Sequence, residues 1–286
     1  PALQKKLTDF GNKPGQFTAL EGDFSNISHI EFVDQNPIGR SSRSNPVTYI
    51  KAYDDIRALY SKQKLSTIRN YQAKHFSFNV DGGRCETCKG EGEVTIEMQF
   101  MADVHLECET CKGNRFKKEV LEVKFNGKSI NDLLNSTIDD AISFFKEHQE
   151  TRIARKLQPL QDVGLGYVTL GQSSSTLSGG EAQRIKLASF LVKGSRQTKS
   201  LFIFDEPTSG LDVITAENII KLIRSCKDQG KTVIFSSHIM SEVDLLCDDL
   251  AIIHKGELKF SGTMQDFKSQ MQTPNLTEEF IRIVQA

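Results

Sequence analysis

The last third of the chain alternates uninterrupted apolar runs with amphipathic segments. LFIFDEP and KTVIFSSH each hold a short apolar run, which is typical of a strand buried on both faces of a sheet. AENIIKLIRSCKDQG, which lies between them, has helical spacing and ends at Gly230. Strands that alternate with helices predict a parallel sheet. We therefore expect an α/β fold with buried strands at 201–204 and 232–236 and a helix over about 215–227.

The sequence pattern divides the whole chain into three segments. Residues 1–74 contain one strand-like run, IEFV, which leads toward Gln35, and then a segment rich in basic residues. Residues 75–125 alternate strand-like runs (HFSFNV, GEVTIEMQF, VLEVKF) with cysteine pairs, which predicts a small inserted β-rich module. Helical spacing returns over 130–160, and residues 126–286 are expected to form the third segment, which carries the α/β pattern.

The composition excludes two classes of protein. The 286-residue chain has 36 basic and 37 acidic residues, for a net charge of −1, and its mean hydropathy is −0.36. No apolar run approaches the roughly 18 residues that cross a membrane, and the N-terminal segment lacks the apolar core of a secretory signal. A membrane-embedded protein and a polyanion-binding charge over the whole chain are therefore excluded. We expect a reducing, cytoplasmic compartment. Because the sequence has no initiator methionine, we expect a fragment or a processed product.

A local positive charge nevertheless lies within residues 36–74. Eight Lys or Arg residues in this stretch are accompanied only by Asp54 and Asp55, which gives a local net charge of +6, and four tyrosines are interleaved with them. Such a stretch is either a solvated protein face or a surface for phosphate contacts. The candidate phosphate-contacting residues are Arg40, Arg43, Lys51 and Arg57.

Four of the six cysteines form two CxxC pairs, Cys85 with Cys88 and Cys108 with Cys111. The 19 residues between the pairs match the spacing of a Cys₄ zinc site, and each pair continues into Lys-Gly, which suits a tight turn at a metal. The alternative is a pair of redox-active or disulfide-forming motifs, which the spacing and the reducing compartment disfavour. We expect one Zn²⁺ ion bound by the four thiolates.

Three further segments carry residues suited to nucleotide chemistry. Asp205 and Glu206 follow a buried strand, at the end of a parallel sheet where ligands bind, and two carboxylates there suit Mg²⁺ coordination and activation of a water molecule. The glycines of LSGGEAQ, with Ser178 before them, suit close approach of backbone N–H groups to a phosphate at the start of a helix. His238 follows the next buried strand. Each feature alone also has an ordinary explanation as a turn, a helix cap or a structural histidine.

Taken in order, these segments resemble the ATP-binding-cassette (ABC) ATPases. Leu177 to Glu181 match the signature loop of that family, Leu201 to Glu206 its Walker B strand, Ser209 to Asp212 its D-loop, His238 its switch histidine, and Gln35 its Q-loop glutamine. The resemblance implies that Glu206 and His238 are catalytic and that Asp205 holds Mg²⁺, directly or through water. It also implies a set of nucleotide-binding residues: Gln35, Leu177, Ser178, Gly179, Gly180, Glu181, Asp205 and Asp212.

The cysteine module narrows the resemblance. VDQNPIGRSSRSNPVTYIKAYDDIR, FSFNVDGGRCETCKGEG and RIARKLQPLQDVGLGYVTLGQSSSTLSGGEAQRIKLA are similar to the second ATPase half of the UvrA family of bacterial nucleotide excision repair, over about residues 1–208. This implies an ATPase of the DNA-damage (SOS) response that uses Zn²⁺, ATP and Mg²⁺ and binds damaged DNA through the basic segment. The implied partners are double-stranded DNA, a second ATPase half or UvrA protomer, and a UvrB-like repair protein.

Two departures from the family pattern leave other functions open. The Gly127-Lys128-Ser129 triplet lacks the glycine five residues earlier that a Walker A loop needs, so the isolated chain is expected to have negligible ATPase activity. From about Ser209 onward the sequence resembles instead the ATP-binding subunit of an ABC-2-type exporter, which suggests a fusion or an assembly artefact. The alternatives are therefore an exporter subunit with a membrane partner and a non-catalytic zinc- and DNA-binding module.

Overall fold

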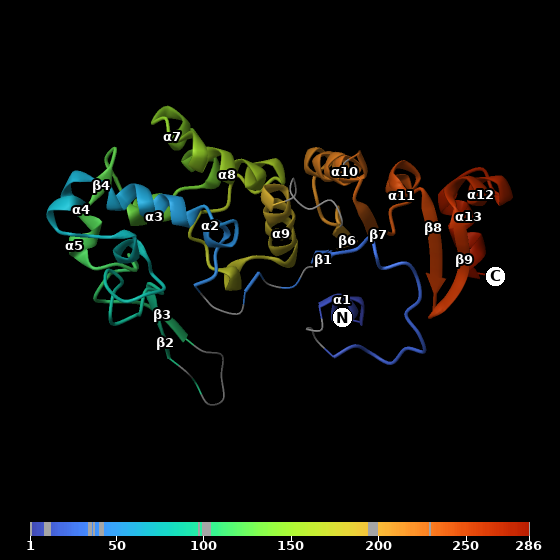
Figure 1. The fold of residues 1–286 in the computed structure, drawn as a ribbon, viewed down its shortest axis with the longest axis horizontal. Coiled ribbons are helices and arrows are strands. Elements are labelled where there is room, and N and C mark those ends of the chain that lie inside the picture. The colour runs from blue at the N-terminus through green and yellow to red at the C-terminus, as the bar shows by residue number, and fades with distance from the viewer. Residues whose placement is uncertain are drawn as a thin grey trace. The chain divides into compact units, whose positions relative to one another are not determined.

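A computed structural model describes residues 2–8, 13–33, 36, 38–39, 43–96, 98, 104–193, 200–228 and 230–285. The chain divides into two compact units, shown along the ribbon of Figure 1. The sheet unit comprises residues 1–34 and 197–286, and the helical unit comprises residues 35–196. The limits of the two units differ from those of the three segments expected from the sequence. The boundaries of those three segments stay a prediction.

The sheet unit combines two separate sheets with flanking helices. Its elements in chain order are α1 (Ala2–Thr8), β1 (His29–Val33), β6 (Ser200–Asp205), α10 (Val213–Asp228), β7 (Thr232–Ser236), α11 (Met240–Leu246), β8 (Asp249–His254), β9 (Glu257–Thr263), α12 (Met264–Gln270) and α13 (Leu276–Gln285).

Its main sheet has the strand order β1–β6–β7, and both strand pairs are parallel. β6 is the central strand, which explains why its apolar run is uninterrupted: Leu201, Phe202 and Phe204 are all buried. The α/β fold class with a parallel sheet is therefore confirmed, as are the positions of the two strands and the helix expected after residue 200. The expectation that the strand at 232–236 is buried is wrong, because β7 lies at an edge of the described sheet and its residues are exposed or only partly buried.

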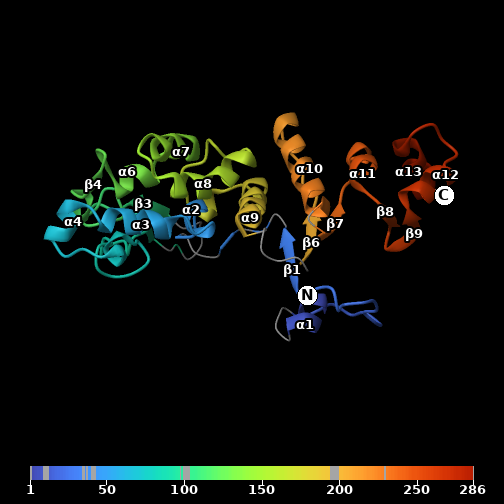
Figure 2. The same ribbon diagram turned by 45° about the horizontal axis from the view of Figure 1, so that its top comes forward.

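One face of this sheet is buried, and the other is partly exposed. α10 packs against β7 and lies along the sheet (Figure 2), while Phe202 and Phe204 are buried on one face. On the other face Phe32, Ile203 and Ile234 are neighbours in register, and they form an apolar row across the three strands. Phe32 and Ile234 are each 54% exposed, so this row is open. Asp205 belongs to the same face, because residues two apart in a strand point the same way.

The C-terminal end of the sheet unit is an antiparallel hairpin of β8 and β9 with three short helices. Val243, Ile252, Met264 and Phe267 form a small buried cluster between the hairpin and helices α11 and α12, and residues of α13 pack against it. A helix, α11, and the β8–β9 hairpin therefore follow His238 in the sheet unit.

The helical unit holds the remaining elements. They are α2 (Pro46–Tyr49), α3 (Tyr53–Ser61), α4 (Lys64–Ile68), the 3₁₀ helix η1 (Ala73–Phe76), β2 (Glu93–Ile96), β3 (Val104–Glu107), α5 (Lys118–Leu121), β4 (Lys124–Phe125), β5 (Lys128–Ser129), α6 (Ile130–Leu134), α7 (Ile138–Glu147), α8 (Thr151–Asp162), the 3₁₀ helix η2 (Ser174–Thr176) and α9 (Gly179–Lys193). Helices α7, α8 and α9 pack in succession (Figure 1), and the helices expected over 130–160 are present as α6, α7 and α8.

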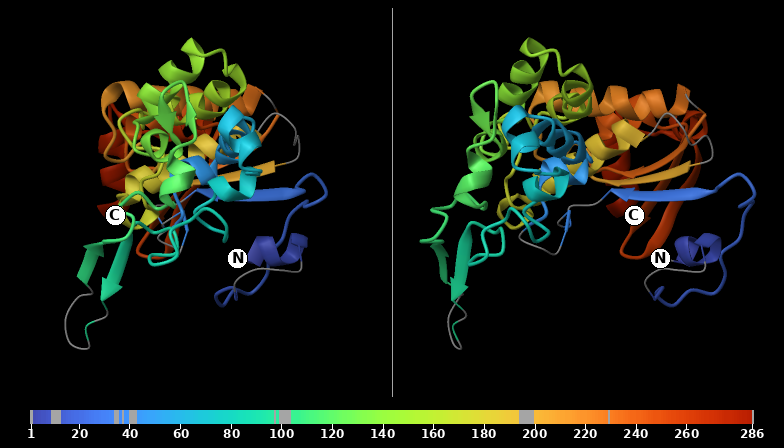
Figure 3. Two further views of the ribbon diagram at one scale, coloured as in Figure 1. Left: turned by 90° about the vertical axis from the view of Figure 1, so that its left-hand side faces the viewer. Right: turned by 60° about the vertical axis from the view of Figure 1, so that its left-hand side comes forward.

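The expectation of a β-rich module over 75–125 is only partly correct. β2 and β3 form an antiparallel ribbon that projects from the helices of its unit (Figure 3). The run HFSFNV, however, begins within a 3₁₀ helix, and VLEVKF is split between α5 and β4. Phe76 and Phe78 are buried against Tyr60 and Tyr53, with ring centroids 5.7 and 5.0 Å apart. Packing against helix α3, rather than strand pairing, accounts for the apolar positions of this run.

Candidate metal centre and nucleotide-contact residues

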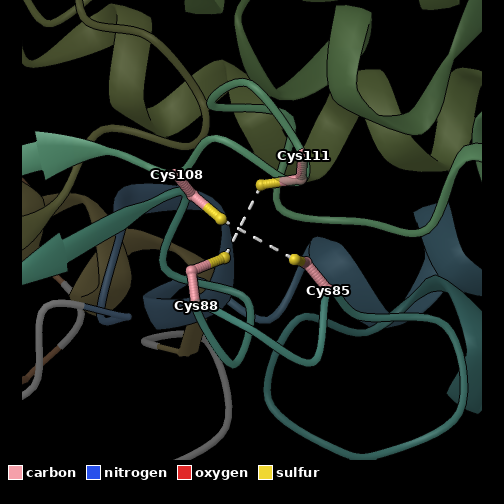
Figure 4. A group of neighbouring side chains, drawn as sticks. All are labelled: Cys85, Cys88, Cys108 and Cys111. Atoms are coloured by element: carbon pink, nitrogen blue, oxygen red, sulfur yellow. Dashed lines mark hydrogen bonds between the residues drawn. The ribbon is translucent and has the colours of Figure 1, made fainter.

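The four paired cysteines converge on one point of the helical unit (Figure 4). All four side chains are buried, and their sulfur atoms lie within 4.8 Å of one another. The Sγ atoms of Cys85 and Cys108 are 3.9 Å apart, and those of Cys88 and Cys111 are 3.6 Å apart. Four sulfurs around a tetrahedral zinc ion, each at about 2.3 Å, would be about 3.8 Å apart. These separations are also far longer than the roughly 2.05 Å of a disulfide bond.

Each CxxC pair and the turn that follows it form a short loop, here called a knuckle. Backbone turns hold the two knuckles in place. The Lys-Gly pair after each CxxC has positive φ angles: 50° and 87° at Lys89 and Gly90, and 48° and 71° at Lys112 and Gly113. A Cβ atom on Gly90 would lie 2.2 Å from the carbonyl oxygen of Phe78, so only glycine fits there. The Lys-Gly sequence therefore marks tight turns, as expected.

Burial and backbone hydrogen bonding shift the pKa values of the cysteine thiols in opposite directions. Burial disfavours the thiolate of Cys108, but hydrogen bonds from the backbone N–H groups of Cys111 and Thr110 outweigh it and lower the pKa of Cys108 to about 7. Burial raises the pKa of Cys88 and of Cys111. A bound cation would favour the thiolate form of Cys88 and Cys111, which suits a metal centre.

In the sheet unit, the candidate catalytic residues gather where β6 and β7 end. Asp205 is in register with Ser236, whose Oγ donates a 2.6 Å hydrogen bond to Asp205 Oδ1. Glu206 lies just after the strand with φ at +48°, a strained value for a residue with a side chain. His238 Nδ1 lies 2.6 Å from Glu206 Oε2. The structure thus brings Asp205, Glu206 and His238 together, and strain at the central residue is typical of functional sites.

Asp212, the expected D-loop aspartate, lies directly before helix α10. It accepts hydrogen bonds from the backbone N–H (3.0 Å) and the hydroxyl (2.6 Å) of Thr215, and these bonds lower the pKa of Asp212. This is the arrangement of a helix N-cap. Asp212 therefore has a structural role in the sheet unit whatever its contact with nucleotide.

Sequence reasoning missed a buried carboxylate behind the catalytic residues. Glu242 in α11 is only 6% exposed and accepts hydrogen bonds from the hydroxyls of Thr208 and Ser237, the latter at 3.1 Å. It ties the turn after Glu206 to the segment that holds His238. No local motif signals this role, because Glu242 is at N3 of α11 but the N-cap residue is Ile239, which forms no capping box.

In the helical unit, the expected signature loop leads into α9, and Ser178 caps this helix. Ser178 Oγ accepts a 3.3 Å hydrogen bond from the Glu181 N–H, and the Ser178 N–H donates to Glu181 Oε2 at 2.8 Å. This is a capping box. Ser178 and Gly179 are exposed, and a Cβ atom on Gly180 would meet nothing within 4 Å. The first turn of α9 therefore leaves room for an anion to approach its N–H groups.

Tyr167 is a further residue of this region that the sequence did not single out. Its hydroxyl donates to Glu181 Oε1 at 2.7 Å and accepts from Arg184 Nη2 at 3.2 Å. Partial burial of Glu181 favours its neutral form, but the hydrogen bonds from the Ser178 N–H and the Tyr167 hydroxyl outweigh it and lower the pKa of Glu181. The carboxylate is thus fixed in its charged form at the start of α9.

Replacing Ser178 with alanine is expected to destabilise the protein by about 1 kcal/mol, because the N-cap of α9 is lost. Urea unfolding in the absence of nucleotide measures this change. Ser175→Ala is the matched control, since Ser175 is exposed and caps no helix in the described structure. Equal unfolding midpoints for the wild type and Ser178→Ala would show that Ser178 has no capping role.

Two arginines of the basic segment, residues 36–74, already lie beside carboxylates of the protein and are less available to a phosphate than the local charge suggests. Arg43 lies 3.3 Å from Glu91, and Arg57 forms an ion pair with Asp54 while its guanidinium lies 5.6 Å from the ring centroid of Tyr53. Lys51 is exposed. Arg40 and Gln35 lie outside the described residues.

Two of the interleaved tyrosines belong to the core of the unit. The Tyr53 and Tyr60 hydroxyls donate to the backbone carbonyls of Phe76 (2.7 Å) and Lys128 (2.9 Å). Burial raises the pKa of both phenols, so they remain protonated. These rings are not available to a nucleic acid.

The sheet topology and the strand-end carboxylates agree with a comparison of the sequence with protein families. A family model described as ABC transporter matches residues 86–209. The chain therefore carries an ABC-type ATPase domain with an α/β fold and a parallel-sheet core.

Similarity to individual proteins shows which family of ABC-type ATPases the chain belongs to. The chain is 50% identical over 237 residues to the UvrABC system protein A of Clostridium acetobutylicum, an alignment that covers 83% of this chain and 25% of that protein. It is 46% identical over 250 residues to the same protein of Staphylococcus aureus, covering 86% and 26%. The crystal structure of UvrA2 from Deinococcus radiodurans matches with a TM-score of 0.81 at 40% identity, over 92% of this chain and 33% of that one.

The chain is thus a homologue of the UvrA proteins, and it spans about a quarter of the length of these curated relatives. An alignment of 237 residues cannot fit within the first 208, so the similarity to UvrA extends past Ser209. The boundary expected there is therefore not where the similarity ends.

Among the residues that the structure describes, no helix is both long enough and apolar enough to cross a bilayer.

Proposed function

We propose that the chain is part of a UvrA-like ABC ATPase that binds damaged DNA in nucleotide excision repair and couples ATP binding and hydrolysis to lesion recognition. The observation that carries the proposal is a four-cysteine cluster with zinc-site spacing in the same compact unit as an open signature helix. An exporter subunit does not account for this cluster. The expected location of such a protein is the cytoplasm.

The carboxylates of the sheet unit suit the hydrolytic part of this function. Asp205 is the residue that would hold Mg²⁺, whose charge stabilises the phosphates during transfer. Glu206 would orient and deprotonate the attacking water, and His238, at 2.6 Å from it, would fix the Glu206 carboxylate or contact the terminal phosphate. Gln35 and Asp212 are proposed as further nucleotide contacts.

The sequence supplies no Lys and Gly-rich loop to hold the β- and γ-phosphates. The open apolar row of Phe32, Ile203 and Ile234 beside Asp205 offers a surface for a segment that carries such a loop. In this proposal the signature residues Leu177 to Glu181 act on nucleotide held by an opposite ATPase half. The isolated chain then has negligible turnover until a half with a Walker A loop is supplied.

Zn²⁺ is the proposed occupant of the cysteine cluster. The donor set is all sulfur, the sulfur separations fit a tetrahedron, and the four side chains are buried as in a closed structural site. The ion would cross-link the two knuckles, and it has no proposed role in hydrolysis.

Double-stranded DNA is proposed to meet the basic segment through its phosphates, with Arg40, Arg43, Lys51 and Arg57 as candidates. The exposed Lys51 is free to approach a phosphate, whereas Arg57 already binds Asp54. Each phosphate contact contributes about 0.9 to the slope of log K against log salt concentration. The other proposed partners are a second UvrA-type protomer and a UvrB-like protein.

Lys51→Ala is expected to flatten the salt dependence of duplex binding by about one unit, while Arg57→Ala changes it less. Fluorescence anisotropy on a labelled duplex at several salt concentrations gives the slopes. Lys221→Ala, in the sheet unit and paired with Glu217, is the control. Unchanged slopes for all variants would mean that the segment is a solvated face.

Two measurements separate this proposal from its alternatives. A non-catalytic zinc- and DNA-binding module would bind DNA but would not support ATP turnover with any Walker A partner. An exporter subunit would show no salt-dependent DNA binding. The exporter alternative also has less support, because the alignment to UvrA continues past Ser209.

A further inference from the structure

Arg115 is connected to both cysteine pairs of the metal centre. It follows one pair closely in the sequence, and its backbone forms a hydrogen bond with the other. It lies four residues after Cys111, and its carbonyl oxygen accepts a 2.8 Å hydrogen bond from the N–H of Cys85. Its φ angle is +67°, a conformation that L-residues adopt at a cost. The backbone at Arg115 is therefore set by the geometry of the cysteine pairs.

The side chain of Arg115 reaches away from the cysteines to another loop. Its Nη1 donates a 2.9 Å hydrogen bond to the carbonyl oxygen of Gly171, which is 56 residues further along the chain. The guanidinium lies 5.9 Å from the ring centroid of Phe78. Burial lowers the pKa of Arg115, and none of the ion pairs found within the described residues includes it. A partly buried guanidinium with this one carbonyl contact holds that carbonyl firmly, because a charge-assisted bond is strong where water is scarce.

Gly171 opens the loop that leads to the signature helix. From Gly171 the chain runs through η2 to Ser178, the N-cap of α9. Other backbone bonds of the loop include those from the N–H groups of Gly171 to Leu134 O (2.8 Å), of Gln172 to Thr169 O (3.1 Å) and of Ser174 to Ser44 O (2.7 Å). A Cβ atom at Gly171 would lie 3.1 Å from Arg115 Nη1, so the two residues are in close contact. Arg115 is therefore an anchor of this loop that comes from the metal centre.

We infer that Arg115 is a positioning residue that makes the order of the 171–178 loop depend on the metal centre. Metal binding fixes the knuckles, the knuckles fix the backbone of Arg115, and its side chain fixes Gly171. Loss of the metal, or of the guanidinium, releases the loop and the start of α9 with it. The importance of this for ATP turnover rests on the proposed function, but the structural dependence itself does not.

Hydrogen–deuterium exchange of the full chain, without nucleotide or DNA, tests the inference. In zinc-loaded Arg115→Met the amides of Gly171, Gln172 and Ser174 are expected to exchange at least about tenfold faster than in the wild type. Chelation should accelerate the same amides in the wild type and add little in the variant. Because no ATP or DNA is present, failure of this experiment is distinct from failure of the proposed function.

Two further variants make the test specific. Arg84→Met removes another arginine of the metal centre, but the guanidinium of Arg84 bonds only to Asn79, Asp81 and Lys89 within the described structure, so it should leave loop exchange unchanged. Arg115→Lys retains a charged donor and should restore most of the protection. Zinc content is measured for each variant, and if Arg115→Met does not retain the metal, the chelated wild type decides, because its 171–178 amides must then exchange faster than those of the zinc-loaded wild type.

Three results would overturn the inference. One is equal protection of the loop in zinc-loaded Arg115→Met and in the wild type. Another is equal acceleration in Arg84→Met, which would indicate general loosening. The third is a chelated wild type whose 171–178 amides remain protected.

Discussion

Replacing Cys108 with serine is expected to abolish zinc binding and to unfold the segment around the metal centre. The buried cluster between the two cysteine pairs consists of the four cysteines themselves, so the ion is what would cross-link the pairs. The β2–β3 ribbon that emerges from the knuckles is largely exposed and cannot stabilise them, since an isolated two-stranded ribbon is marginal in water. Structural zinc sites contribute about 10–16 kcal/mol of apparent binding free energy in small domains, far more than any other single interaction proposed for this protein.

Elemental analysis and limited proteolysis measure this effect. The wild type should contain one zinc ion per chain with sulfur ligands at about 2.3 Å, and Cys108→Ser should contain none and be cleaved near residues 85–115. Cys226→Ser is the matched control, because Cys226 is equally buried but lies in α10 of the sheet unit. A zinc-free wild type in which the thiols titrate freely in the folded protein would contradict the assignment.

The second large effect is expected at Glu206. When a half with a Walker A loop is supplied, Glu206→Gln should lower ATP turnover by about 10²- to 10⁴-fold, because the amide cannot accept a proton from the attacking water. The amide keeps the size and shape of the side chain, so the fold and nucleotide binding should survive.

Steady-state phosphate release measures the rate, and nucleotide affinity is measured in parallel. Glu217→Gln is the control, since this exposed carboxylate of α10 pairs with Lys221 on the helix surface. Retained turnover in Glu206→Gln with unchanged affinity would assign the base to another residue, and His238→Ala would then be the next variant to measure.

The parts of the site that depend on local order were predictable from the sequence. Asp205 ends a buried strand and Glu206 follows it, and the cysteine spacing specifies two knuckles, so the neighbours of these residues in sequence determine where they lie. The identity of the α/β fold came from the same kind of local pattern, because strands and helices alternate after residue 200.

Contacts between distant segments were not predictable. Arg115 meets Gly171 and Tyr167 meets Glu181 only after the helical unit has folded, and nothing in their own segments indicates it. The same holds for the run HFSFNV, where Phe76 and Phe78 pack on tyrosines of α3 instead of pairing as a strand. The local charge of the basic segment also overstates its freedom, since Arg43 and Arg57 already have carboxylate partners.

ATP turnover during titration with a half that carries a Walker A loop is the most direct test of the central claim that this chain supplies the signature and catalytic residues of a UvrA-like ATPase. The zinc-loaded chain alone should be inactive, and activity should rise to saturation as the half is added and increase further with duplex DNA. Robust turnover by the pure chain, abolished by Glu206→Gln, would contradict the account, as would no turnover at any ratio of the two folded partners.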